Sequence, residues 1–279
     1  MKQPLYDPAL IALAPLTVWG ISPPELVTVA SEAGYDAIGI KLYSAKARAM
    51  PHPMAVGSPM MKETLARLSG TGLRVLDIET FYLEAGMTFD AFGALLDAAA
   101  ELGAENLLVG VATRDLSEAG AQFGRLCELA RPYGLTPCLE FFPAWHGVQD
   151  LARARAILAC ANHPAGRLLL DTLHAHRTGL SPARLRELPP GELRYVQLSD
   201  ASASEPTDLT ALEQEAMRGR LLPGEGVIAL DEFLGAVEPG LPVSIEVPVR
   251  ERLGLDDARI HAKACMAAAR RVFAGARPA

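Results

Sequence analysis

Eight apolar runs recur along the chain, and each is followed by a stretch with helical character. The runs cover residues 11–19, 37–42, 74–81, 106–111, 137–142, 167–172, 195–200 and 243–247. They are nearly continuous in apolar residues, which is typical of parallel strands covered on the outside by helices. Eight strands alternating with eight helices predict an α/β protein, a single-domain (β/α)8 TIM barrel that spans residues 1–279.

The stretches between the runs carry the signals of helix ends. Several open with Ser, Thr or Asp and close with Gly, as in SGTG, ELG and PYG. An open doubly wound sheet is the alternative architecture, but no GxGxxG motif follows the first run. The long connection at residues 201–227 is polar and rich in Glu and Arg. A connection of this length in a compact domain predicts a functional lid.

The charge of the chain bears on its partners. Half of the 279 residues are hydrophobic, and 26 Lys+Arg against 33 Asp+Glu give a net charge of -7. Because no run of Lys or Arg is present, we expect no nucleic-acid partner and instead a small-molecule substrate. The N-terminus lacks the organisation of a signal peptide, and no apolar run approaches membrane-spanning length. We therefore expect a cytoplasmic protein without a membrane partner.

Polar residues interrupt the apolar runs near their ends, where barrel enzymes place their chemistry. They are Asp77, Glu79, Glu140, Asp171, Gln197, Asp200 and Glu246. Each alone has an ordinary explanation, such as a buried ion pair or a turn cap. Together, several carboxylates in apolar strands are costly to bury and repel one another unless they share a cation. An oxygen-rich donor set favours Mg²⁺ or Mn²⁺, with Co²⁺ or Zn²⁺ as alternatives.

Five motifs identify a family resemblance. EFFP, DTLHAHRTG, YVQLSD, RLLPGEG and SIEVP, in this order, resemble the xylose-isomerase-like TIM barrel superfamily. That group includes sugar phosphate isomerases and epimerases, inosose and 3-dehydroshikimate dehydratases, and endonuclease IV. The resemblance covers essentially the whole chain and is most specific over residues 138–247. It implies one divalent metal ion held by Glu140, Asp171, Gln197 and Glu246.

The residue at position 197 departs from most members. Most sugar epimerases of the superfamily have His where this chain has Gln197, and a Gln here resembles the bacterial 3-dehydroshikimate dehydratase branch. An amide oxygen is a harder ligand than imidazole, which shifts the preference from zinc towards Mg²⁺ or Mn²⁺. The His residues that the three-zinc site of endonuclease IV requires are missing.

The resemblance implies proton-transfer chemistry. Glu140 and Glu246 are expected on opposite sides of the barrel mouth, as both ligands and catalytic acid/base groups. They would remove a proton α to a carbonyl, which forms an enediolate intermediate. The chain is thus predicted to be a metal-dependent sugar or sugar-phosphate isomerase or epimerase. The alternative is a lyase of the 3-dehydroshikimate or inosose dehydratase type, and a non-catalytic sugar-binding barrel is the third reading.

Further side chains are candidates for substrate binding. His174 resembles the family histidine that binds a substrate oxygen, and Arg220 matches a family position that lines the pocket. The remaining candidates are Lys41, Glu79, His146 and Arg177, for which a surface salt bridge is the alternative. Trp19, Phe142 and Trp145 are candidates for an apolar wall against a sugar, with packing in the core as the alternative. The substrate is expected to be a sugar or polyol ketone, and the barrel is of a kind that commonly forms homo-oligomers.

Overall fold

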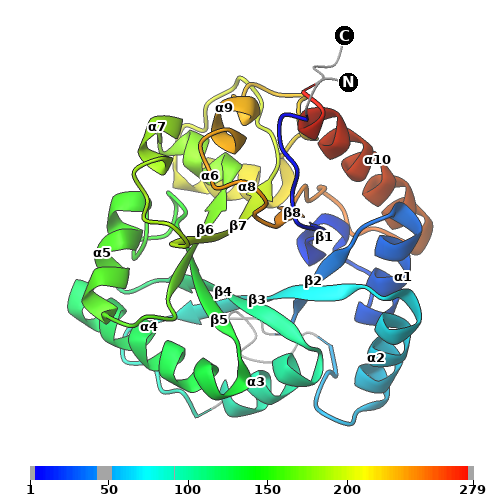
Figure 1. Ribbon diagram of the computed structural model, residues 1–279, viewed down its shortest axis with the longest axis horizontal. Coiled ribbons are helices and arrows are strands. Elements are labelled where there is room, and N and C mark those ends of the chain that lie inside the picture. Colours follow the sequence, from blue (N-terminus) through cyan, green and yellow to red (C-terminus); the bar gives the residue numbers. More distant parts are fainter. Residues whose placement is uncertain (1–3, 43–51, 91, 276–279) are drawn as a thin grey trace.

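The strands close into a barrel. The computed structural model describes residues 4–42, 52–90 and 92–275, in which eight parallel strands pair in sequence order and the last pairs with the first (Figure 1). They are β1 (Ile11–Leu13), β2 (Ala37–Lys41), β3 (Arg74–Leu83), β4 (Ala104–Val111), β5 (Thr136–Glu140), β6 (Arg167–Asp171), β7 (Leu193–Leu198) and β8 (Val243–Ile245). The predicted (β/α)8 TIM barrel is confirmed.

Helices surround the strands on the outside of the barrel (Figure 1). They are α1 (Pro23–Ala33), α2 (Pro59–Thr71), α3 (Phe92–Glu101), α4 (Leu116–Ala130), α5 (Leu151–Ala161), α6 (Thr172–Arg177), α7 (Pro182–Leu185), α8 (Leu209–Arg218), α9 (Leu230–Leu234) and α10 (Leu255–Phe273), with short 3₁₀ helices η1 (Pro15–Val18) and η2 (Arg131–Tyr133). No helix in the described ranges combines the length and the apolar character that crossing a membrane requires.

The helix-end signals of the sequence correspond to real caps. The Glu25 carboxylate accepts the backbone N–H of Ser22 at 2.7 Å, and α1 ends at Gly34 with φ of 78°. The Asp115 carboxylate accepts the backbone N–H of Glu118 at 2.8 Å at the start of α4. These contacts satisfy N–H groups that the first turn of a helix leaves free.

Two segments differ from the predicted elements. The first strand was expected over residues 11–19 but ends at Leu13, because Pro15 lacks an N–H and opens η1 instead. The long connection at residues 201–227 contains α8, which the sequence analysis did not identify. Asp208 accepts the N–H of Ala211 at its start, and Gly219 follows its end.

The packing inside the barrel determines where along the strands the polar residues of the site begin. A buried apolar layer fills its centre, consisting of Leu10, Ala12, Ala37, Leu76, Leu108, Cys138, Leu169 and Tyr195. Alternate residues of each strand face inward, so the next inward residue of β5 and β6 after Cys138 and Leu169 is Glu140 and Asp171. The polar side chains therefore begin where the apolar layer ends, at the carboxyl end of the barrel.

Candidate active site

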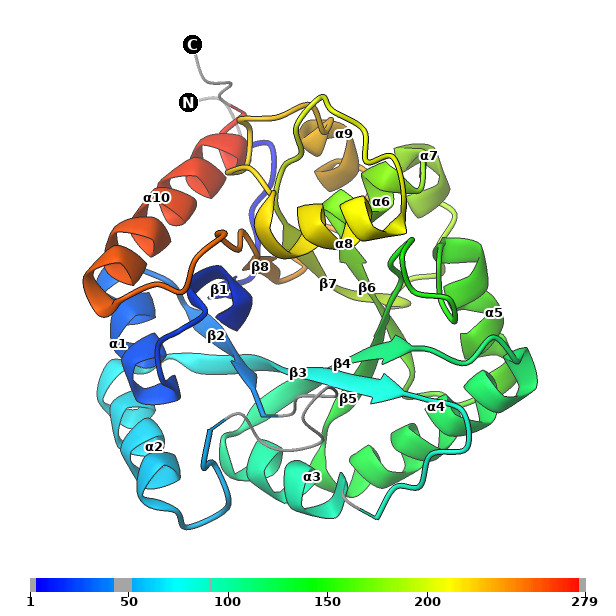
Figure 2. The same ribbon diagram turned by 180° about the vertical axis from the view of Figure 1, so that it is seen from behind.

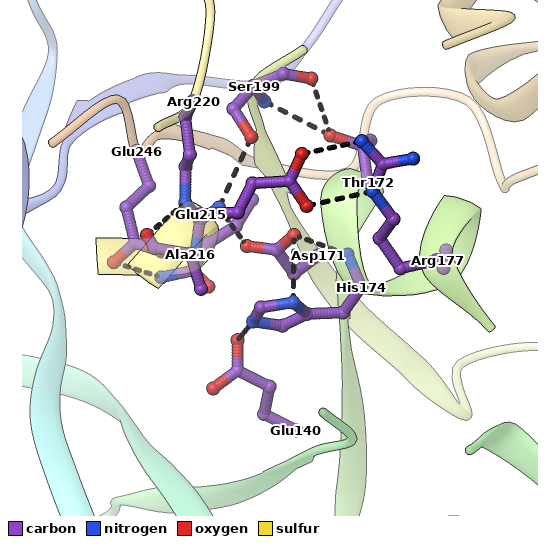
Figure 3. A network of polar contacts seen from close by, with 12 residues as sticks. Glu140, Asp171, Thr172, His174, Arg177, Ser199, Glu215, Ala216, Arg220 and Glu246 are labelled. Atoms are coloured by element: carbon purple, nitrogen blue, oxygen red, sulfur yellow. Dashed lines mark hydrogen bonds and ion pairs between the residues drawn. The ribbon is translucent and has the colours of Figure 1, made fainter. Parts of the chain in front are cut away.

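Four polar side chains from adjacent strands meet at this end. Glu140 ends β5, Asp171 ends β6, Gln197 lies in β7 and Glu246 directly follows β8. The register pairs Asp171 with Gln197, and Gln197 with Ser244, which places these strand ends side by side. All four side chains are buried. Figure 3 shows Glu140, Asp171 and Glu246 around one centre. The four expected metal ligands are thus brought together.

Arg220 enters this group from the chain segment after α8. Its guanidinium nitrogens lie 2.5 Å from Asp171 Oδ2 and 2.8 Å from Glu246 Oε2, and one also donates to Ser199 Oγ at 3.2 Å (Figure 3). Its Nε donates to the carbonyl of Ala216 at 2.8 Å. Burial acts to lower the pKa of Arg220, but the two carboxylates outweigh it and hold this pKa above its ordinary value. A permanent positive charge therefore stands inside the site.

His174 occupies the opposite side of Asp171. Its backbone N–H donates to Asp171 Oδ1 at 3.0 Å, and its Nε2 lies 3.8 Å from Glu140 Oε1. The ring stacks on Phe142, with centroids 4.2 Å apart. Burial lowers the pKa of His174 to about 4, so the imidazole is neutral at neutral pH. A neutral ring offers one donor and one acceptor nitrogen, which suits a metal ion or a substrate hydroxyl.

The carboxylates have divergent pKa values. Burial is the largest influence on the Glu140 carboxyl, and together with Asp171 and Glu246 it raises the pKa of Glu140 well above its ordinary value. Burial also raises the pKa of Glu246 although Arg220 opposes it. For Asp171, Arg220 and His174 outweigh burial and lower the pKa. Three carboxyl groups beside one arginine therefore leave negative charge that is not compensated when all ionise.

The donor atoms fit a divalent cation. One ligand atom each from Glu140, Asp171 and His174 lies within 4.8 Å of the others. The Gln197 amide donates to Glu246 Oε1 at 3.4 Å, while its buried Oε1 has no hydrogen-bond partner among the described residues. A cation here would coordinate that oxygen and offset the crowded carboxylates. His174, expected only at the substrate, also lies within reach of this centre.

A pocket of about 450 Å³ opens above these groups. Its lining consists of Leu16, Lys41, Glu79, Thr80, Tyr82, Leu108, Glu140, Phe142, Trp145, His174, Glu213, Ala216, Met217, Arg220 and Glu246. Lys41 and Glu79 thus stand where substrate-binding side chains were expected. The rings of Phe142 and Trp145 contact each other edge to face, with centroids 5.5 Å apart, and form part of the apolar wall. The pocket joins a polar floor to an aromatic side, the usual arrangement of a small-molecule site.

Three expected side chains lie elsewhere. Arg177 does not line the pocket, because its guanidinium is held by Glu215 at 2.5 and 2.8 Å. His146 is exposed in the loop after β5 and does not line the pocket either. Trp19 lines a separate cavity beside Lys41, and its Nε1 donates to the carbonyl of Val249 at 2.9 Å.

The pocket wall includes residues that the sequence analysis missed. Glu213, Ala216 and Met217 come from α8, and Tyr82 comes from the end of β3. The signal for α8 was present in the sequence as an N-cap aspartate, Asp208, and a glycine just after the helix. The polar composition of this segment made α8 hard to predict, because Ala216 is its one buried apolar residue.

Asp200 holds the segment that follows α8. Its carboxylate accepts backbone N–H groups of Gly224 and Gly226 at 3.0 Å and of Ile228 at 2.9 Å. A Cβ at Gly226 would lie 2.2 Å from the carbonyl oxygen of Ala201, so only glycine fits this turn. Asp200 is thus a structural anchor for the loop that carries Arg220.

A buried acid lies one level below the site. Asp77 of β3 is fully buried opposite Gly39 of β2, where a Cβ would lie 2.4 Å from Asp77 Oδ1. Burial raises the pKa of Asp77 from 3.8 to about 7, and Glu246 adds to this effect while the Tyr195 hydroxyl opposes it. Since the pKa is higher in the folded state, stability is greatest below the ordinary pKa and falls as the pH rises through about 7.

The substitution Asp77→Asn should therefore stabilise the protein at pH 8, where the wild-type carboxyl must ionise in an apolar layer. We expect the free energy of unfolding to rise by roughly 2 kcal/mol at pH 8, and the gain to shrink as the pH falls towards 4. Urea unfolding at both pH values measures it. The exposed Asp7→Asn is the matched control and should show no such gain. A gain that does not change with pH would contradict the explanation.

Comparison with known proteins identifies the family. The chain matches the model of the xylose isomerase-like TIM barrel family over residues 27–269, and it belongs to that family. No curated protein matches the chain by sequence.

Solved structures share the fold at low sequence identity. One is a xylose isomerase-like TIM barrel/4-hydroxyphenylpyruvate dioxygenase fusion protein, with 20% identity and a TM-score of 0.76 over 94% of this chain and 42% of the fusion protein. The chain thus spans less than half of that protein. A probable 3-DHS dehydratase, AsbF, from Bacillus anthracis has 19% identity and a TM-score of 0.72, covering 92% and 97% of the two chains. D-allulose 3-epimerase from Methylomonas sp., solved with D-allulose, has 18% identity and a TM-score of 0.66, covering 96% and 98%.

Proposed function

We propose that this protein is a divalent-metal-dependent isomerase or epimerase of a sugar or sugar phosphate. It would remove a proton α to a carbonyl and return it through an enediolate. The observation that carries the proposal is the pair of buried carboxyls, Glu140 and Glu246, which reach one pocket from β5 and β8. Asp171 and Gln197 stand on the two strands between them.

The metal would be held by Glu140, Asp171, Gln197 and Glu246, with His174 beside them. When bound, a divalent cation polarises a substrate carbonyl and stabilises the negative charge of an enediolate. Burial raises the pKa of Glu140 and of Glu246, which suits carboxyl groups that take up and release a proton during the reaction. Because they approach from different strands, one can take a proton from one face of a carbon and the other can return it to the opposite face.

The other lining residues would bind and orient the substrate. Arg220 and Lys41 place positive charge where a carbonyl or hydroxyl oxygen gains electron density. Neutral His174 can donate or accept one hydrogen bond from a hydroxyl. Phe142 and Trp145 offer an apolar surface to the C–H face of a sugar and keep water from the reacting carbon.

A dehydratase is the second candidate, and Gln197 is the residue that favours it. β-Elimination of water from a cyclic polyol ketone starts with the same proton removal and differs only in loss of a hydroxyl group. A Gln at position 197 resembles the 3-dehydroshikimate dehydratase branch, and the solved structures that share the fold include a probable 3-DHS dehydratase as well as a D-allulose 3-epimerase. A non-catalytic sugar-binding barrel is disfavoured, because a binding module gains little from clustered buried acids.

Incubation with candidate ketoses and polyol ketones in D₂O separates these functions. We expect a product of unchanged molecular formula that carries solvent deuterium at the carbon beside the carbonyl, as detected by mass spectrometry and NMR. Exchange at that carbon is the consequence of proton removal by a carboxylate in contact with water. Loss of water and the ultraviolet absorbance of an unsaturated ketone would instead assign the dehydratase.

A further inference from the structure

Helix α8 lies across the end of the barrel that carries the candidate site (Figure 2), and its residues line two separate pockets. On one face, Glu213, Ala216 and Met217 line the 450 Å³ pocket. On the other, residues including Gln214 and Glu215 line an open groove of about 660 Å³. Ala216 is the one buried apolar residue of α8. A helix with so little buried surface gains little stability from apolar packing.

A buried ion pair joins α8 to the barrel. The Arg177 guanidinium donates to both carboxylate oxygens of Glu215, at 2.5 and 2.8 Å, in the bidentate geometry that makes such pairs strong (Figure 3). Their side chains are only 6% and 10% exposed. Arg177 also donates to the carbonyls of Ser202 and Ser204, at 3.0 and 3.1 Å, so it binds the chain that leads into α8 as well.

Both ends of this ion pair connect to the site. Arg177 ends α6, the short helix that begins next to Asp171 and contains His174. Glu215 precedes Ala216, whose carbonyl accepts the Nε of Arg220 at 2.8 Å. The position of α8 therefore determines where the Arg220 guanidinium stands relative to Asp171 and Glu246.

We propose that the Arg177–Glu215 ion pair is a catch that holds α8 closed over the pocket. Arg177 is accordingly a positioning residue, which acts through α8 and Arg220 and does not touch the substrate. The kinetic part of this proposal rests on the proposed isomerase function, whereas the closure of α8 does not.

The chemistry of the pair suits a contact that must open. An apolar contact of equal size exposes hydrophobic surface when it separates, and that surface gains no favourable interaction with water. A separated arginine and glutamate recover their hydration, which offsets much of their lost attraction. The pair can thus specify one closed position of α8 without making release of a product slow.

Hydrogen–deuterium exchange over residues 209–218 tests the catch without a substrate. The variants are Arg177→Gln, Glu215→Gln and the double variant, with Glu205→Gln as control because Glu205 is an exposed acid in the same connection. Loss of a buried ion pair should speed exchange in α8 by at least about tenfold in either single variant. Exchange in β1 to β8 should stay unchanged. The double variant should exchange no faster than the single ones, since both remove one contact.

Trypsin provides a second measurement at the same place. Arg218 is exposed in the last turn of α8, so cleavage after it requires this turn to open. In Glu215→Gln, cleavage should accelerate in parallel with hydrogen–deuterium exchange. Arg177→Lys should be better protected than Arg177→Gln, because it keeps the positive charge. Wild-type protection of α8 in both single variants would overturn the catch. Faster exchange throughout the barrel would overturn it too, because the pair would then stabilise the whole fold.

The steady-state constants test the positioning role. If the variants leave α8 mostly open and substrate binding closes it, KM should rise by the inverse of the fraction of molecules in which α8 stays closed, while kcat stays within about twofold. An unchanged KM in variants whose α8 is mostly open would overturn the role of Arg177 in positioning. If no ketose or polyol ketone is turned over by the wild type, the proposed function fails, and exchange and proteolysis still decide whether the catch exists.

Discussion

Replacing Glu246 by Gln should abolish the exchange of substrate protons with solvent. The substitution keeps the shape of the side chain and removes both its negative charge and its capacity to carry a proton. Since positioned acid–base groups contribute large factors to such reactions, we expect kcat to fall by about 10³-fold or more. Deuterium incorporation from D₂O, followed by mass spectrometry, measures the loss directly.

The fold should tolerate this change. Arg220 then keeps one carboxylate partner, Asp171, which lowers the stability as Asp171→Asn does, but Gln197 and Arg220 can still hydrogen-bond to a neutral amide at position 246. The circular dichroism spectrum should therefore match that of the wild type, and the control Glu205→Gln should retain full exchange activity. Near-wild-type exchange in the folded Glu246→Gln variant would show that this carboxyl carries no proton.

The barrel was predictable because its signal is repeated along the chain. Each apolar run has to be buried on both faces, and parallel strands with short connections allow few arrangements of eight such runs. The first strand was predicted too long because Val18 is buried in η1 as a strand residue would be. The pattern of apolar residues therefore predicts the architecture, whereas the end of the first strand depends on the restricted backbone of Pro15.

The site was only partly predictable, for a different physical reason. Glu140 and Asp171 are conspicuous in the sequence because charged residues at the ends of apolar strands demand an explanation. Arg177 and Arg220 look alike in the sequence, but one binds Glu215 and the other binds Asp171 and Glu246. That distinction depends on the position of α8, which pattern alone does not give.

Divalent cations should stabilise the folded protein if these oxygens form a metal site. Addition of Mn²⁺ to chelator-treated protein should raise the midpoint of thermal unfolding, because a ligand that binds only the folded state adds about 2.7 kcal/mol at a hundredfold excess over Kd. Catalytic exchange should disappear after EDTA treatment and return with Mn²⁺ or Mg²⁺. Differential scanning fluorimetry against metal concentration measures the first effect without any substrate.

Asp171→Asn should eliminate this response to Mn²⁺. The variant will also lose stability without metal, since Arg220 is left with one carboxylate partner in place of two. The informative quantity is therefore the shift on adding metal and not the starting temperature. The exposed Asp7→Asn should keep the full shift. A wild type that does not respond would favour the sugar-binding barrel, because the ion pairs of Arg220 would then be the means by which the buried acids are compensated.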